Sequence, residues 1–400
     1  MKIVFLSDDF PPENYGGAGV VAHDLAKGLK DLGHDVHIIT STQDRDGESE
    51  HTQEGLKIYK IYSKYHPRWR AYRSVYNRQT VGKIRMIMLG LKPDLVHVHN
   101  IHTHLSYHAL RISKRIAPRV ILTAHDAMLY SYGKVCDERR ADWMEQLVEN
   151  RFRYNPIRNI LIKFYLRYVD RVVAVSDSLA RALINNGIKN VTTIHNGISV
   201  KDWAASKDSV DLFKREHKLA GKKTILTIGR LNGAKGAGKI VEALALVVED
   251  VPGAVLIVAG REDGYFQTML ELAKINHIEE HLICTGWLTR EDTVIVYNAV
   301  DVVVTPSIYL DPFVLINLEA MAAKKPVVGT CFGGTPEIVA DNETGYIVNP
   351  NDVAELAAKI IWLLNNESVA VEMGARGYLR ASDIFTIKRQ IEEYLIAYVK

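Results

Sequence analysis

The stretch between positions 301 and 337 constrains the fold more than any other part of the chain. It reads DVVVTPSIYLDPFVLINLEAMAAKKPVVGTCFGGTPE. The valines at 302–304 are typical of a buried strand, a helix carrying Glu319 follows, and a second strand at 326–329 leads into a Gly-Gly turn. Strands that alternate with helices predict a parallel sheet. Because helix starts present free N–H groups and the positive end of the dipole, this stretch predicts an anion-binding edge.

Two carboxylates in the same stretch indicate a second kind of ligand. Asp311 and Glu319 are eight residues apart, which is just over two helical turns, so we expect both side chains on one side of a helix. Carboxylates accept hydrogen bonds from hydroxyl groups such as those of sugars. The combination predicts a sugar site beside a phosphate site.

The length and the charge distribution favour two domains. The chain has 400 residues, which exceeds one ordinary core and suits two domains of about 200 residues. Residues 1–200 carry 29 Lys and Arg against 20 Asp and Glu, whereas residues 201–400 carry 21 against 27. Opposite net charges fit two domains that face each other across a cleft. We place the boundary near residue 200, with the hinge between there and residue 222.

Cysteine usage and hydropathy indicate the compartment. The three cysteines are scattered and odd in number, so no disulfide framework is expected. We expect a protein of the reducing cytoplasm. The first residues form a strand followed by two aspartates rather than a signal peptide. No run approaches 18 apolar residues, so no membrane span is expected.

The first half opens with a strand–turn–helix–strand unit. A strand at 2–6 is followed by the loop SDDFPPENYGGAG, a helical apolar spacing from Val20, and a strand at 35–40. This order predicts a doubly wound parallel sheet. The glycines lack the spacing of a dinucleotide fingerprint. From these residues alone, a ligand-binding turn and a turn without a ligand are equally supported.

The second half begins with a similar series. A strand at 223–229 is followed by GRLNGAKGAGKI, in which Arg230 leaves the strand and Lys235 precedes a helix start. Two cations at a helix start suit a diphosphate, and two solvated charges are the alternative. The spacing differs from that of a Walker A loop, which disfavours ATP hydrolysis. Further strands are expected at 254–260 and 281–286, and the C-terminal end has a helical pattern.

Histidines cluster near two predicted strand ends. His97 and His99 share one face of a strand, but no Cys or carboxylate joins them at ligand spacing. We therefore favour polar residues at a strand end over a metal site. His125 ends the strand at 119–126, at the edge where open α/β sheets bind ligands; a structural histidine is the alternative. The segment 127–145 is expected to be a long loop beside this edge.

Residues 57–85, which we call the basic strip, belong to a strongly cationic region. Residues 55–93 contain ten Lys and Arg and no Asp or Glu. Aromatic residues interleave with the cations: Tyr59, Tyr62, Tyr65, Trp69, Tyr72 and Tyr76. The strip is either a solvated basic face or a docking surface for anionic lipid headgroups or an acidic glycan. No nucleic-acid-binding motif accompanies it, so nucleic acid is not an expected partner.

Five motifs together resemble the retaining glycosyltransferases of family GT4, which have the two-domain GT-B fold. In chain order they are the Gly-Gly pair at 16–17, T-x-H-D at 123–126, G-R-x4-K-G at 229–236, the E-x7-E region at 311–319 and the turn GGTPE at 333–337. The first carboxylate of the fourth motif is Asp311, where the family usually has Glu. The resemblance covers essentially the whole chain.

The resemblance implies an α/β architecture of two Rossmann-like doubly wound domains. Residues 1–200 would form the acceptor-side domain and residues 201–383 the domain that binds the nucleotide sugar. Residues 384–400 would form a C-terminal helix that returns to the first domain.

The resemblance also implies roles for individual residues. Arg230 and Lys235 would stabilise negative charge on the leaving phosphate in place of a metal ion, so neither a metal nor a cofactor is expected. His125 and Asp311 would orient the transferred sugar, and Glu319 would hold the ribose hydroxyls. Donor contacts are further implied for Gly16 and Gly17 and for the backbone N–H groups of Gly333, Gly334 and Thr335. Leu288, which follows a strand end, either borders the base of the donor or packs in the core.

The implied reaction transfers a sugar, with retention, from a UDP- or GDP-sugar to a hydroxyl acceptor such as a lipid-linked or polysaccharide glycan. A sugar-nucleotide epimerase of the same fold is one alternative. A non-catalytic subunit that binds a nucleotide sugar is another, because Asp311 replaces the usual Glu. The basic strip adds an expected peripheral contact with the anionic inner face of a membrane.

Overall fold

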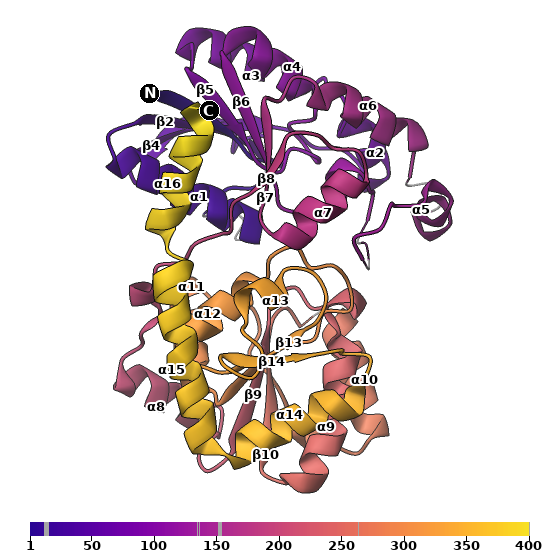
Figure 1. Cartoon of the computed structure of the whole chain (residues 1–400), viewed down its shortest axis with the longest axis vertical. Coiled ribbons are helices and arrows are strands. Elements are labelled where there is room, and N and C mark those ends of the chain that lie inside the picture. Colours follow the sequence, from indigo (N-terminus) through magenta and orange to yellow (C-terminus); the bar gives the residue numbers. More distant parts are fainter. Residues whose placement is uncertain (12–15, 134, 136, 151–153, 263, 400) are drawn as a thin grey trace. The chain divides into compact units, whose positions relative to one another are not determined.

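The computed structural model describes residues 1–11, 16–133, 135, 137–150, 154–262 and 264–399. The chain divides into two compact units (Figure 1). Unit 1 contains Met1–Gly197 and Ile387–Lys400, and unit 2 contains Ile198–Thr386. The chain therefore crosses between the units twice, three residues before the expected boundary at residue 200 and again three residues after 383.

Unit 1 is built on one eight-stranded sheet. The strand order is β3-β4-β2-β1-β5-β6-β7-β8, and neighbouring strands are parallel except β3 and β4, which are antiparallel. The strands are β1 (Lys2–Leu6), β2 (Asp35–Thr42), β3 (Ser49–Gln53), β4 (Leu56–Tyr62), β5 (Leu95–Val98), β6 (Arg119–Ala124), β7 (Arg171–Ala174) and β8 (Val191–Thr193). The central strands are nearly continuous apolar runs, as expected where helices cover both faces.

The helices of unit 1 form two groups around this sheet. Its α-helices are α1 (Gly17–Asp31), α2 (Arg70–Arg73), α3 (Val81–Leu91), α4 (His108–Ile116), α5 (Trp143–Asn150), α6 (Pro156–Leu166), α7 (Asp177–Asn185) and α16 (Ile387–Val399). Helices α1 and α16 pack side by side, and α4 packs between α3 and α6 (Figure 1). The packing of α1 on α16 is close because Gly28 has no side chain: a Cβ there would lie 2.2 Å from Ile391.

Helix α16 completes the core of unit 1. Its residues Ile391, Tyr394 and Tyr398 are buried against strands of the sheet. The hydroxyl of Tyr394 lies 2.9 Å from the hydroxyl of Thr123, at the carboxyl end of β6. The C-terminal helix thus belongs structurally to the first part of the chain.

Unit 2 is built on a six-stranded parallel sheet in the order β11-β10-β9-β12-β13-β14. The strands are β9 (Lys223–Ile228), β10 (Ala254–Ala259), β11 (Leu282–Cys284), β12 (Val302–Thr305), β13 (Val327–Thr330) and β14 (Gly345–Val348). Numbered within the unit, this is the 3-2-1-4-5-6 order of the Rossmann fold. The prediction of two Rossmann-like doubly wound domains is confirmed.

The α-helices of unit 2 cover both faces of its sheet. They are α8 (Lys207–Glu216), α9 (Ala237–Asp250), α10 (Gly264–Ile275), α11 (Arg290–Ala299), α12 (Leu315–Ala322), α13 (Thr335–Ile338), α14 (Val353–Asn365) and α15 (Glu367–Ile384). Helix α9 packs against α10 and α14, and α12 packs against α15. Among the described residues, no helix has both the length and the apolar composition needed to cross a bilayer.

The strand order fixes where a ligand can lie in each unit. In a doubly wound sheet, ligands bind beyond the carboxyl ends of the strands where the order reverses. In unit 2 this point lies between β9 and β12, and in unit 1 between β1 and β5. The loop after β9 begins at Gly229, and the loop after β12 leads to Asp311.

Candidate active site

The loop after β9 is shaped by local polar contacts. Gly229 and Gly236 have φ values of 111° and 75°, which glycine adopts without strain. The side chain of Asn232 accepts a hydrogen bond of 3.0 Å from the N–H of Lys235. A Cβ on Gly236 would lie 1.9 Å from the carbonyl oxygen of Pro306, so the two loops touch through backbone alone. The position of Lys235 is therefore determined by Asn232 and Gly236.

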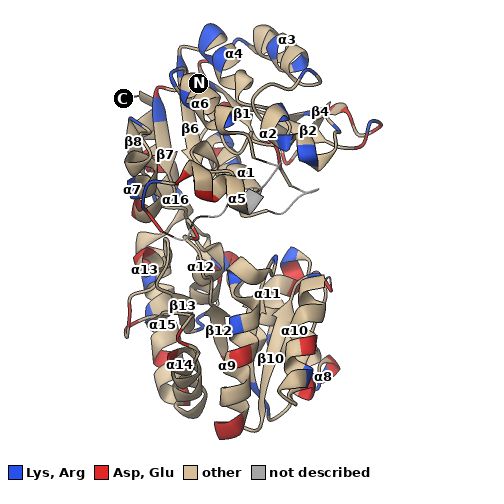
Figure 2. Cartoon of the chain, turned by 90° about the vertical axis from the view of Figure 1, so that its right-hand side faces the viewer, with Lys and Arg blue, Asp and Glu red and all other residues tan. Residues whose placement is uncertain are grey.

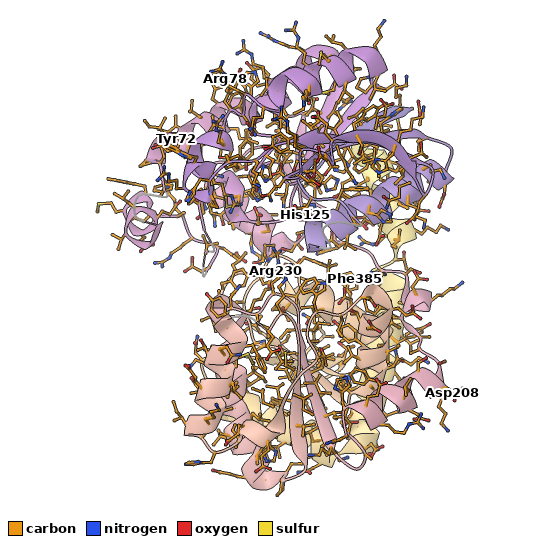
Figure 3. The ribbon with its side chains drawn as sticks, turned by 180° about the vertical axis from the view of Figure 1, so that it is seen from behind. Tyr72, Arg78, His125, Asp208, Arg230 and Phe385 are labelled. Carbon is orange, nitrogen blue, oxygen red and sulfur yellow. The ribbon has the colours of Figure 1, made fainter. Side chains whose placement is uncertain are left out.

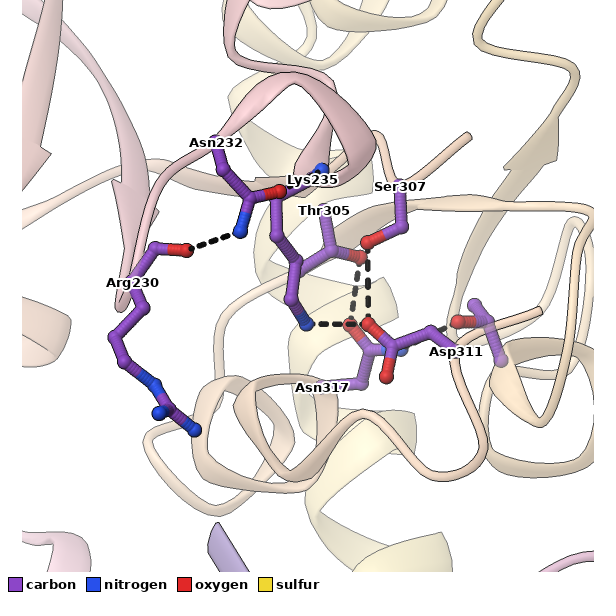
Figure 4. A network of polar contacts seen from close by, with 8 residues as sticks. Arg230, Asn232, Lys235, Thr305, Ser307, Asp311 and Asn317 are labelled. Atoms are coloured by element: carbon purple, nitrogen blue, oxygen red, sulfur yellow. Dashed lines mark hydrogen bonds and ion pairs between the residues drawn. The ribbon is translucent and has the colours of Figure 1, made fainter. Parts of the chain in front are cut away.

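Lys235 and Asp311 form an ion pair between these two loops (Figure 4). Asp311 is only 5% exposed, and its Oδ2 atom also accepts a hydrogen bond of 3.2 Å from the hydroxyl of Ser307. The ammonium group of Lys235 lies 5.6 Å from the centre of the Tyr309 ring. A fixed cation thus lies at the carboxyl edge of the sheet, at the reversal between β9 and β12.

The Gly-Gly turn packs directly on Asp311. Gly333 has φ 68°, and a Cβ there would lie 2.1 Å from the carbonyl oxygen of Asp311. The N–H of Gly334 donates a hydrogen bond of 2.9 Å to the same oxygen. The Gly334 N–H is therefore used by Asp311 in this structure, and its contact with a donor phosphate stays a prediction.

A chain of buried side chains supports this arrangement from below. The hydroxyl of Thr305 donates to Asn317 at 2.8 Å, and the amide of Asn317 donates to the hydroxyl of Thr335 at 3.2 Å (Figure 4). All three side chains are buried. This chain joins the end of β12 to helix α12 and to the start of α13.

Glu319 has contacts different from those of the Lys235–Asp311 pair. Helix α12 begins at Leu315, so Glu319 is on the helix and Asp311 precedes it. The expectation that one helix presents both carboxylates was wrong, because the chain from Asp311 to Val314 forms a loop. The hydroxyl of Tyr297 donates to Glu319 Oε2 at 2.7 Å. Burial raises the pKa of Glu319, while the Tyr297 hydrogen bond and Arg290 oppose this rise.

Arg230 and Leu288 are on separate loops of unit 2. Arg230 is exposed, and its side chain lies to one side of the Lys235–Asp311 pair (Figure 4). Arg230 also appears in the view of the whole chain (Figure 3). Among the described residues it has no ion-pair partner. Leu288 lies half-buried between β11 and α11, beside the exposed Trp287. The structure therefore brings Lys235, Asp311 and the Gly-Gly turn together and leaves Arg230 extended.

His125 is part of a histidine pair in unit 1. His125 Nε2 lies 2.8 Å from His99 Nδ1, so one proton lies between the two rings. Burial lowers the pKa of His125 to about 4 and that of His99 well below its ordinary value. Both rings are therefore neutral near pH 7. Gly16 precedes and Gly17 begins the 15-residue helix α1, next to residues 12–15, which lie outside the described part of the chain.

The other predicted strand-end histidine, His97, has a structural environment. Its Nδ1 and Nε2 atoms each lie 2.7 Å from a hydroxyl, of Tyr398 and Thr123 respectively. Both ring nitrogens are thus used within the core, where α16 meets the sheet. This supports the interpretation of polar residues at a strand end over that of a metal ligand.

Several supporting residues were missed from the sequence. Asn317 and Tyr297 lie in helices whose neighbours are mostly apolar, and only their burial reveals their hydrogen bonds. Asn232 had a visible signal, because Asn three residues before Lys235 at a turn is a typical cap. Ser307 follows a strand end, where polar residues frequently meet a ligand.

The basic strip has a partly buried and an exposed part. Tyr59, Tyr62 and Tyr65 are half-buried, whereas Trp69, Tyr72 and Tyr76 are exposed. Lys and Arg also mark the surfaces of α3 and α4 (Figure 2). The exposed part of the strip is therefore the region around α2.

Two family models match the chain. Residues 15–202 match the model described as Glycosyltransferase Family 4, and residues 209–380 match the model described as Glycosyl transferases group 1. The two matches follow the division between the first and the second unit of the structure.

Curated relatives and solved structures agree with these models. The chain is 27% identical over 399 residues to N-acetyl-alpha-D-glucosaminyl L-malate synthase of Bacillus anthracis, covering 96% of this chain and 93% of the relative. It is 24% identical to a glycogen synthase of Mycobacterium tuberculosis, covering 92% and 87%.

Among solved structures, sucrose-phosphate synthase of Thermosynechococcus elongatus has a TM-score of 0.81 at 20% identity, covering 99% of this chain and 98% of the other. The Anabaena protein HepE in complex with UDP and glucose has a TM-score of 0.77 at 18% identity, covering 99% of both chains. These likenesses support the GT-B fold. With both family models matched along the chain, this protein is an enzyme that belongs to the glycosyltransferases of the family 4 type.

Proposed function

We propose that the protein transfers a sugar, with retention of anomeric configuration, from a nucleotide diphosphate sugar to a hydroxyl acceptor. The observation that carries this proposal is the Lys235–Asp311 ion pair at the reversal point of the unit 2 sheet. An ion pair with one partly exposed cation offers both a positive group for phosphate and an acceptor for sugar hydroxyls. A fully buried salt bridge would offer a ligand neither the positive group nor the hydrogen-bond acceptor.

The chemistry proposed for this site is electrostatic. As the sugar–phosphate bond breaks, negative charge grows on the leaving phosphate, and positioned donors stabilise it. Lys235 is held by Asp311, and the extended Arg230 is free to approach a phosphate from a second direction. Two cations then replace the metal ion that other transferases use, so we propose a metal-independent reaction without a cofactor. The leaving phosphate would accept the proton of the acceptor hydroxyl.

The donor proposed is a UDP- or GDP-sugar. The similar HepE structure contains UDP and glucose, and a mannosyltransferase of Mycobacterium tuberculosis that is 29% identical over 170 residues is named as GDP-mannose-dependent. Glu319 is suited to the ribose hydroxyls, since only its Oε2 atom is used by Tyr297. His125, Gly16 and Gly17 would contribute to the sugar side of the donor.

The acceptor proposed is a glycan or a lipid-linked glycan. Names of the relatives include malate, glycogen and phosphatidylinositol, so the family type alone does not specify the acceptor. We further propose that the basic strip contacts an anionic membrane surface from the cytoplasmic side, where a lipid-linked acceptor would be found.

Calorimetry with UDP and GDP, followed by assays with the corresponding sugar nucleotides and a panel of acceptors, tests the proposal. We expect micromolar-range binding of one nucleotide and product only when an acceptor is present. The anomeric configuration of the product, read by NMR, should equal that of the donor. Formation of a new sugar nucleotide from donor alone would identify an epimerase instead. Binding without turnover on any acceptor would identify a non-catalytic subunit.

A further inference from the structure

Helix α6 presents an apolar stripe to solvent instead of to the core. Ile157, Ile160, Leu161 and Phe164 are 59%, 68%, 38% and 39% exposed. Their spacing of three, four and seven residues from Ile157 is the pattern that normally faces a protein interior. The stripe therefore has the composition of a buried face in an exposed position.

A buried arginine fixes this orientation. Arg158 lies on the buried side of α6 together with Ile162 and is fully buried. Its guanidinium donates to the carbonyl oxygens of Met128 at 2.9 Å and Ser131 at 3.3 Å, and to the hydroxyl of Ser74 at 3.3 Å. Rotating α6 to bury the stripe would remove these partners and leave a charge unpaired, which is strongly unfavourable. The outward direction of the stripe is thus built into unit 1.

The surroundings of the stripe are cationic. Lys163 and Arg167 are exposed beside it, and the Arg167 guanidinium lies 4.3 Å from the centre of the Phe164 ring. The sequence contains no Asp or Glu from residue 150 to residue 169. Helix α4, which packs against α6, also lacks carboxylates and carries Lys and Arg (Figure 2).

A row of aromatic rings connects the stripe with the exposed part of the basic strip. Phe164 contacts Tyr165 with ring centres 5.7 Å apart, Tyr165 contacts His108 at 5.6 Å, and His108 contacts Tyr76 at 4.9 Å. Tyr72 and Arg78, close to Tyr76 in the chain, point outward (Figure 3). Aromatic residues at the boundary between apolar and charged groups are typical of membrane–water interfaces.

We infer that the apolar stripe of α6 inserts into the headgroup region of an anionic lipid bilayer, with Lys163, Arg167 and the basic strip contacting the phosphates around it. Charge complementarity favours a bilayer over a second copy of this chain, because a symmetric contact would bring like-charged rims together. Only one part of this inference, the contact made by the basic strip, rests on the membrane contact proposed above. The apolar insertion depends on α6 alone and is independent of glycosyl transfer.

Vesicle co-sedimentation of the full chain tests this inference. The vesicles are phosphatidylcholine, either pure or with about one-third phosphatidylglycerol. The I160S/F164S variant should bind the anionic vesicles at least about tenfold less tightly, at low and at high salt, because apolar insertion is not screened. The K163Q/R167Q variant should bind the anionic vesicles less tightly than the wild type at low salt. At high salt, where charges are screened, the two should bind equally. The control variant V371S/L379S removes two exposed apolar residues from α15 and should bind like the wild type.

Two further measurements separate this inference from its rivals. The F164W variant should show more quenching by brominated lipids than the wild type, whose native tryptophans include the exposed Trp69 of the basic strip. Equal binding of the wild type and I160S/F164S, or no more quenching in F164W than in the wild type, would overturn the insertion. A wild-type dimer that I160S/F164S converts to a monomer in sedimentation velocity would overturn it in favour of self-association. Nucleotide binding by calorimetry should be unchanged in all variants, so failure here is distinguishable from failure of the proposed function.

Discussion

The ammonium group of Lys235 is ion-paired with the carboxylate of Asp311, 76 positions away in the chain. The pair joins the loop after β9 to the loop after β12. The buried carboxylate holds the ammonium group in place, but it also competes with any phosphate for that charge. On the proposed function, a donor has to offer enough negative charge to share Lys235, as a diphosphate does.

Replacing Arg230 or Lys235 by alanine should separate an effect on turnover from an effect on stability. R230A and K235A should each lower kcat by roughly 10²–10³, the scale for losing one positioned donor. K235A should also lower the melting temperature, because it leaves Asp311 buried without its partner, whereas R230A should not. Steady-state kinetics and calorimetric melting measure both effects, with K207A on the exposed surface of α8 as the control. Near-normal turnover in R230A and K235A would eliminate the assignment.

Activity should persist in excess chelator. On the proposed function, Lys235 and Arg230 together supply the positive charge at the leaving phosphate, so Mg²⁺ or Mn²⁺ is not required to neutralise it. The measurement is the initial rate before and after EDTA treatment, and after adding back each divalent ion. Complete loss with EDTA and recovery with one ion would contradict the role given to Arg230 and Lys235.

The two carboxylates should differ in their kinetic effects. E319Q should weaken nucleotide binding by roughly 10–150-fold, the value of a hydrogen bond to a charged acceptor, since the ribose does not react. D311N should lower kcat as well as affinity, because it changes both the proposed sugar contact and the charge that holds Lys235. D311E should shift the preference among donor sugars more than nucleotide affinity.

Calorimetry with the nucleotide and kinetics with several donors check this division. Y297F is a matched variant for Glu319: it removes one hydrogen bond and keeps the carboxylate, so its effect should be smaller than that of E319Q. The division fails if E319Q leaves nucleotide affinity intact or D311N leaves kcat intact.

Adding one methyl group at Gly333 should lower stability and activity by displacing Asp311. G333A combines a φ of 68° with a Cβ 2.1 Å from the backbone of Asp311. We expect a cost of about 1–3 kcal/mol in the free energy of unfolding and a lower kcat, since Asp311 must move. Urea unfolding and kinetics measure these effects. The control is G238A in α9, where a Cβ meets nothing within 4 Å and stability should rise slightly. A G333A variant with wild-type kcat would show that Asp311 tolerates displacement.

Acid should destabilise unit 1 through its buried histidines. Burial lowers the pKa of His97 to about 3 and those of His102 and His125 to about 4. Between about pH 6.5 and pH 4 the unfolded chain binds protons at these positions and the folded chain does not, so stability falls as pH falls. Each histidine contributes up to about 1.4 kcal/mol per pH unit.

Urea unfolding at about pH 7 and about pH 5 tests this dependence. H97Q should reduce the loss of stability between these pH values, because one titrating group is gone. H66N, at an exposed position of the same unit, should keep the wild-type loss. An equal loss in H97Q and in the wild type would contradict the assignment.

The sequence predicted the doubly wound order because β9, β10 and β12 are short segments rich in apolar and β-branched residues between helical patterns. It did not predict β3 or β4: β3 reads SEHTQ, a polar edge strand without an alternating apolar pattern. The strand β14 was missed because it is short and begins at Gly345, where a Cβ would lie 2.3 Å from the carbonyl oxygen of Val327.

Only some residues of the candidate site could be predicted from the sequence. Motif spacing identified Lys235 and Asp311, but their mutual pairing depends on two loops meeting, which spacing along the chain does not reveal. Asn317, Tyr297 and Arg158 gave no signal because nothing in their local sequence distinguishes them from polar residues that face solvent. Their importance comes from burial, which is a property of the packed structure.

The place of α16 in unit 1 has a consequence for synthesis on the ribosome. Residues 387–400 complete a core that begins with residue 1, and unit 2 is translated in between. At about 5–20 residues per second, unit 1 waits on the order of 10–40 s with the surface around His97 and Thr123 uncovered. During that interval the nascent chain exposes the apolar surface that Ile391, Tyr394 and Tyr398 later bury, which is the kind of surface that chaperones near the ribosome bind.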